Sequence, residues 1–130
     1  MNPTWRPFFL VAALYDVVLG AAFFLLYEPL FEWMGVPLPP NTSYIHLTAA
    51  FVFTQGIGYW FVYQDPLANR GIVKIGVVYK FMFSALAFYY LAIDQLIHPV
   101  FLLFGVLDIL FLIGFVLFLR ETSAREVPAA

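Results

Sequence analysis

The chain has no cysteine and few charged residues, and both absences narrow what it can be. Without a thiol it forms no disulfide and offers no thiolate ligand to a metal ion or an iron–sulfur cluster. Lysine and arginine together number only six and the formal net charge is −2, so no basic surface is available for nucleic acid. The sequence therefore excludes thiol enzymes and predicts that no nucleic acid binds.

Apolar residues take the place of the missing charges. Hydrophobic residues make up 64% of the 130 residues and charged residues only 11%, whereas a soluble domain carries about 25% charged residues. The mean hydropathy is +0.91. A water-soluble fold of this size could not bury so much apolar surface, because small domains bury the smallest fraction of theirs. We expect a multi-pass integral membrane protein, located in a bacterial cytoplasmic (inner) membrane.

Four apolar runs are each near the ~20 residues that a helix needs to cross the hydrocarbon core. They cover residues 8–27, 46–64, 71–93 and 97–119. Prolines cluster between them, where they start or stop helices. The sequence therefore predicts an all-α fold, with a four-helix transmembrane domain over residues 1–120 and a short polar tail over 121–130.

The basic residues predict how these helices are oriented, because cytoplasmic loops are enriched in lysine and arginine. The connections after the first and third runs contain neither residue. Basic residues occur before the first run, at the junction of the second and third runs, and after the fourth: Arg6, Arg70, Lys74, Arg120 and Arg125. We expect an antiparallel bundle with both termini in the cytoplasm, and a short helix in "EPLFEWMG" that lies on the outer surface.

Each run carries one strongly polar residue near its middle: Asp16, Gln55, Lys80 and Asp108. At the helical rise of about 1.5 Å per residue, these residues lie ~13 to ~17 Å from the nearest predicted span end. The hydrocarbon core is about 30 Å thick. All four are therefore expected at the bilayer midplane, as an intramembrane polar network.

Small residues share the helix faces of these polar residues, and small residues are where membrane helices approach closely. The expected close-packing positions are Gly20, Gly58, Gly76, Ser84 and Gly105. The polar side chains should then point into the bundle, where the hydroxyls of Tyr15, Tyr59 and Tyr79 complete their hydrogen bonds. Facing lipid, each charge would cost at least about 2.5–3.5 kcal/mol.

The predicted network is not electrically balanced, since one ammonium and two carboxylates leave a formal charge of −1. Either one aspartate holds a proton, or a cation or cationic ligand supplies the missing charge. Two interpretations remain open. The network is a site that binds a ligand or handles protons, or it only fixes helix pairing and register.

The sequence contains no catalytic signature, and we expect no enzymatic activity. His46 and His98 begin the second and fourth runs, so both should lie near the outer surface. Their spacing matches no metal-ligand motif, which leaves them as weak candidates in a chain for which we predict no metal site. No Ser–His–Asp arrangement can be assigned to two interfacial histidines.

A family resemblance rests on "YDVVLGAAFFLLYEPLFEWMGVP", on "GIGYW" and on a polar residue in each later run. In these features the chain resembles the small four-span bacterial membrane proteins of the DoxX-like type. The resemblance implies a four-helix membrane bundle, and some such proteins are associated with quinone-linked or redox complexes. The cysteines of some redox members are absent here, which argues against a thiol or sulfur-transfer role.

These features predict a non-enzymatic membrane protein with one of two roles. It is either an accessory subunit of a larger membrane complex or a binder of a lipophilic molecule, such as a quinone or a lipid, with no other cofactor. Its expected partners are membrane lipids and either other membrane subunits or further copies of itself. The alternative is a small proton- or cation-coupled transporter that uses Asp16 and Asp108, with Lys80 as their counter-charge.

Overall fold

The computed structural model describes residues 2–125, and within them it contains helices and no strand. Residues 126–130, the end of the predicted polar tail, lie outside the described residues. The helices are α1 (Trp5–Leu25), α2 (Tyr27–Met34), α3 (Ser43–Gln64), α4 (Arg70–Ala92), α5 (Val100–Glu121) and a short 3₁₀ turn, η1 (Ser123–Arg125). Four of them, α1, α3, α4 and α5, are long and apolar enough to cross a membrane. The prediction of an all-helical, multi-pass membrane protein agrees with this structure.

The ends of the long helices lie within one helical turn of the predicted run ends. Local chemistry accounts for two helix ends, one of them at α2. Pro99 precedes α5 with a φ of −58°, already suited to a helix start. Gly35 ends α2 with a φ of 73°, a left-handed conformation that glycine adopts without a steric penalty.

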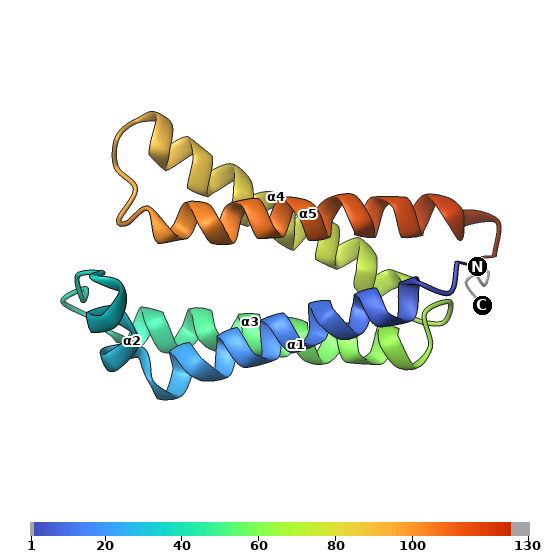
Figure 1. Cartoon of the computed structure of the whole chain (residues 1–130), viewed down its shortest axis with the longest axis horizontal. Coiled ribbons are helices and arrows are strands. Elements are labelled where there is room, and N and C mark those ends of the chain that lie inside the picture. The colour runs from blue at the N-terminus through green and yellow to red at the C-terminus, as the bar shows by residue number, and fades with distance from the viewer. Residues whose placement is uncertain (1, 126–130) are drawn as a thin grey trace.

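The four long helices form two pairs, α1 with α3 and α4 with α5 (Figure 1). The start of α1 and the end of α5 lie at one end of the molecule, where the backbone N–H of Asn2 and the Trp5 indole N–H both donate to the carboxylate of Glu121. We call this the terminal end. The opposite end carries α2 and the connection between α4 and α5, and we call it the α2 end (Figure 1).

Aromatic side chains hold the two pairs together near the terminal end. Phe9 of α1 stacks on Phe115 of α5, with ring centroids 5.6 Å apart, and lies edge-on to Phe118 at 4.9 Å. Tyr59 of α3 lies 5.0 Å from the Phe115 ring. These four side chains are fully buried, so the core of the molecule lies toward the terminal end.

At the α2 end the pairs diverge, and α2 lies across the end of the α1–α3 pair (Figure 1). The helix predicted in "EPLFEWMG" is present as α2. It buries Phe31 and exposes Trp33. Many large apolar side chains on the outside of all four long helices are exposed, as expected for surfaces that face lipid.

Candidate functional site: a polar network below an apolar cavity

Lys80 of α4 lies at the centre of the molecule and binds two carboxylates. Its Nζ is 3.1 Å and 3.3 Å from the two oxygens of Asp16 on α1, and 3.0 Å from Oδ1 of Asp108 on α5. Lys80 and Asp16 are each 1% exposed and Asp108 is 5% exposed. The structure therefore brings together three of the four predicted midplane residues. Through them it links both helix pairs.

Aromatic rings enclose the rest of the ammonium group. Its Nζ lies 5.2 Å from the ring centroid of Tyr15, 5.4 Å from that of Tyr79, 5.7 Å from that of Tyr59 and 5.2 Å from that of Phe111. A cation within about 6 Å of a ring face is attracted by the ring's quadrupole. The positive charge of Lys80 is therefore stabilised by two carboxylates and by the aromatic rings around it.

The predicted role of the tyrosine hydroxyls is wrong for Tyr15 and Tyr79. Their rings face Lys80, while among the described residues their hydroxyls make no hydrogen bond to either aspartate. The Tyr15 hydroxyl is buried and has no hydrogen-bond partner there. The ammonium takes both oxygens of Asp16 and one oxygen of Asp108, and it is the rings of Tyr15 and Tyr79, rather than their hydroxyls, that face it.

Gln55 of α3 lies outside the ion network, contrary to the predicted four-residue network. Its Nε2 donates to the hydroxyl of Tyr59, 3.3 Å away and one turn along the same helix. It is the ring of Tyr59 that faces Lys80. α3 therefore contributes an aromatic face to the network where the sequence predicted a polar group.

The predicted close-packing positions differ in how tightly they are packed. A Cβ on Gly20 would lie 2.5 Å from a backbone nitrogen of α3, and one on Gly76 would lie 2.8 Å from the Tyr59 hydroxyl. At Gly58 it would meet only a side-chain methyl group, at 3.0 Å, and at Gly105 it would make an ordinary contact at 3.5 Å. Ser84 is buried and donates a hydrogen bond to the Gly105 carbonyl at 3.0 Å.

Two further glycines that the sequence analysis missed are also tightly packed. A Cβ on Gly56 would lie 2.6 Å from the backbone of Val17, and one on Gly114 would overlap the ring of Phe8. Gly56 could have been found from its spacing, since it follows Ala49 by seven residues, about two helical turns, and both small residues then lie on one face of the helix. No spacing within α5 indicates that Phe8 packs against Gly114, because the contact depends on how the two pairs meet.

An apolar cavity of about 500 Å³ lies directly against the network. Asp16, Asp108, Tyr15 and Tyr79 line its inner end. Its walls extend toward the α2 end and are mostly aromatic and aliphatic; they include Leu19, Phe23, Phe31, Val52, Phe83 and Phe104. Residues of the α2–α3 and α4–α5 connections, among them Pro37 and Ile97, also line it. Its size is within the ~300–1,000 Å³ typical of small-molecule sites.

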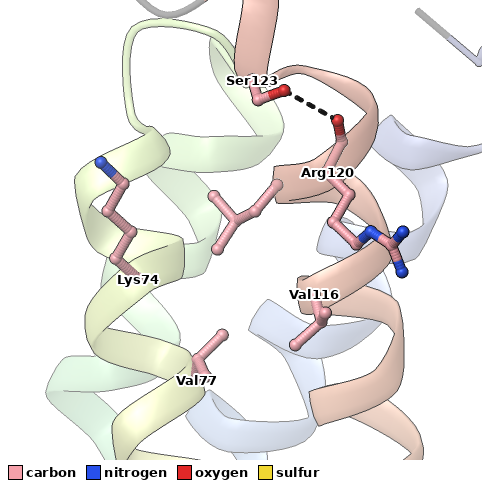
Figure 2. A pocket seen from close by; sticks show the side chains of 6 residues that line it. Lys74, Val77, Val116, Arg120 and Ser123 are labelled. Atoms are coloured by element: carbon pink, nitrogen blue, oxygen red, sulfur yellow. Dashed lines mark hydrogen bonds between the residues drawn. The ribbon is translucent and has the colours of Figure 1, made fainter.

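A second hollow of about 450 Å³ lies at the terminal end between α4 and α5. Figure 2 shows Lys74 and Arg120 on opposite sides of it, with their charged ends directed away from its centre. Val77, Val116 and Leu119 form the lining between them, and Ser123 donates to the Arg120 carbonyl at 3.0 Å. This hollow presents apolar groups rather than a pair of converging cations.

Arg70, read from the sequence as a loop cation, is 4% exposed at the start of α4. Its Nε donates to the Thr122 hydroxyl at 2.9 Å and its Nη2 to the Leu119 carbonyl at 2.7 Å. These bonds tie the start of α4 to the end of α5.

The two histidines are in separate surroundings. The His46 ring packs 4.8 Å from that of Phe24 and 5.1 Å from that of Tyr27. His98 precedes α5, and its Nδ1 accepts a hydrogen bond from the Val100 backbone N–H at 3.0 Å. Among residues 2–125 no group of three or more histidine, aspartate or glutamate side chains is arranged to hold a metal ion.

Comparison with known proteins adds no assignment: no family model, curated protein or solved structure matches this chain.

Proposed function

We propose that this multi-pass membrane protein is a non-enzymatic binder of a lipophilic molecule, which occupies the cavity next to the Lys80 network. The observation that carries the proposal is the cavity itself, about 500 Å³ of mostly apolar space with two carboxylates and two tyrosines at its inner end. Binding sites for small molecules combine a mainly apolar lining with a few polar groups that orient the ligand. A lipid or a quinone-like molecule has the matching shape, an apolar body with a polar head.

The proposal includes an orientation. The four long helices cross a bacterial cytoplasmic membrane in alternating directions, with the terminal end in the cytoplasm and the α2 end outside. The distribution of lysine and arginine supports this orientation. The cavity then extends from the bilayer midplane toward the outer leaflet. The resemblance to DoxX-like proteins is compatible with such a role and stays a prediction.

An accessory role in a larger complex fits the same surface, because exposed apolar side chains on the long helices can contact other subunits as well as lipid. The cavity favours the ligand-binding role over this one, since a purely structural subunit has no need of an internal space next to buried charges.

A proton- or cation-coupled transporter remains the second candidate, and one observation favours it. Lys80 pairs with both aspartates, so the network has one positive and two negative groups. If these groups carry protons, Asp16→Asn or Asp108→Asn abolishes pH-driven uptake into proteoliposomes, while the protein still folds.

The test of the binding role is to extract the protein gently with its native lipids and identify by mass spectrometry every molecule that stays bound. We expect one specific lipophilic compound at about one per chain. Its retention should fall sharply in Val52→Trp, because Val52 lines the cavity and the indole would fill it. Val78→Trp is the matched control, since Val78 is 54% exposed on α4.

Retention of the same compound by both variants would show that it binds outside the cavity and would contradict the proposal. Recovery of stoichiometric protein partners and no small molecule would favour the accessory-subunit role.

A further inference from the structure

We infer that the occupant of the cavity is an amphipathic amine, whose protonated head group binds Asp108 and Tyr15 and whose apolar body fills the space toward the α2 end. The inference rests on the proposed function, because it names the chemical class of ligand for the same cavity. Four features of the inner end of the cavity lead to it.

The first feature is the unbalanced charge of the network. One ammonium stands against two carboxylates, which leaves a formal charge of −1 in a space enclosed by apolar side chains. A ligand that carries one positive charge would neutralise the network.

The second feature is which groups face the cavity. Asp16 and Asp108 line it, whereas Lys80 does not. The ammonium has three donors, and they are directed at the carboxylates, with Nζ within 3.3 Å of three carboxylate oxygens. A ligand that enters the cavity therefore meets the negative groups of the network and not the positive one.

The third feature is two polar atoms without partners, each on a residue that lines the inner end. Oδ1 of Asp108 accepts from Lys80, while its other oxygen accepts no hydrogen bond from any residue that the structure describes. The buried Tyr15 hydroxyl also lacks a partner within residues 2–125. A primary ammonium group has the donors to satisfy both oxygens. A carboxylate or phosphate head group would instead face two like charges.

The fourth feature is the wall. Among the described residues that line the cavity there is no lysine, arginine or histidine to receive an anion. The aromatic side chains that line it include Tyr15, Tyr79, Phe23, Phe83 and Phe104. Aromatic faces attract a cationic head group and pack well against an apolar body.

The test compares three probes that differ only in their head group: dodecylamine, dodecanol and dodecanoate. Each is added to the full chain in nanodiscs of zwitterionic lipid, and the bound probe is counted by native mass spectrometry. We expect the amine to be retained at least about tenfold better than the alcohol, as a charge-assisted hydrogen bond requires, and the carboxylate to be retained least.

Asp108→Asn should lower retention of the amine to about that of the alcohol and leave the alcohol nearly unchanged. Glu32→Gln is the matched control, since it removes one negative charge from an exposed position on α2 and should change nothing. If Asp108→Asn fails to fold, the three probes in the unchanged chain still test whether the cavity prefers an amine. Tyr15→Phe, which removes only the hydroxyl, should then lower retention of the amine and not of the alcohol.

The outcomes separate this inference from the proposed function. Equal retention of the three probes, abolished by Val52→Trp, would overturn the amine inference while the cavity stays a lipophilic binding site. Preferred retention of the alcohol or the carboxylate would also overturn it. If no probe is retained and no native compound is recovered, both the inference and the proposed function fail.

Discussion

Lys80 shows how a residue that is costly in lipid becomes part of a stable core. An ammonium at the bilayer centre costs at least about 2.5–3.5 kcal/mol. Here it is 1% exposed and has a carboxylate on α1 and another on α5. The charges stabilise one another only while the helix pairs stay together, so the network makes the assembly of the bundle specific.

Replacing Lys80 by methionine should destabilise the protein strongly, because it leaves two buried carboxylates without a counter-charge. Removing one partner of a buried ion pair typically costs about 3–5 kcal/mol. The free energy of unfolding, measured at equilibrium in bicelles, should fall by about that amount. Lys74→Met, at an exposed position of the same helix, should change it by less than about 1 kcal/mol.

Neutralising the whole network should restore much of that loss. The triple variant Asp16→Asn, Lys80→Met, Asp108→Asn leaves no buried charge, and replacing a complete buried ion network is often neutral for stability. We expect the free energy of unfolding of the triple variant to be closer to the wild-type value than that of Lys80→Met is. If the triple variant retained the native ligand as well, the network would be purely structural.

At the scale of helices, the backbones of α1 and α3 come into direct contact at Gly20. Alanine at Gly20 would place its Cβ 2.5 Å from the Phe53 nitrogen and 2.8 Å from the Ala49 carbonyl oxygen, and backbone atoms cannot move aside as a side chain can. The two helices must therefore separate. Gly20→Ala should lower the free energy of unfolding by about 1–3 kcal/mol. Gly71→Ala is the control, because nothing lies within 4 Å of the added Cβ. Equal stabilities of the two variants would show that the helices are not in contact at Gly20.

The α4–α5 pair depends less on backbone contact and includes a buried hydrogen bond from Ser84 to the Gly105 carbonyl. Hydrogen bonds between membrane helices average about 0.6 kcal/mol. Ser84→Ala should therefore cost about that much, well below the loss at Gly20, in the same unfolding measurement. A loss of several kcal/mol would mean that the hydroxyl also supports the ion network.

At the scale of the whole molecule, the absence of cysteine makes the predicted orientation easy to test. Single cysteines at Asn41 and Gln95 should react in intact cells with a thiol reagent that cannot cross the membrane. Cysteines at Asp65 and Ala124 should react only after the cells are permeabilised, because the lysine and arginine distribution predicts that this end lies in the cytoplasm. Labelling of Asp65→Cys in intact cells would reverse the orientation, and with it the leaflet to which the cavity extends.

The sequence by itself determined the class of protein and its helices. Whether a run of residues can cross a membrane depends on its own length and polarity, so the four long helices could be located without knowing their neighbours. The small α2 was also predictable from its local pattern. The energetic cost of charges in lipid was enough to predict that the aspartates and Lys80 point inward.

Only the tertiary structure decided which inward residues meet. Helical periodicity gives the face on which a side chain lies, but not the partner or the angle between helices. For this reason Gln55 was placed in a network from which Tyr59 separates it, and the close approach at Gly114 was missed. The cavity has the same origin: the pairs join through aromatic side chains near one end and diverge at the other, and that geometry is a property of the packed pairs rather than of any single segment.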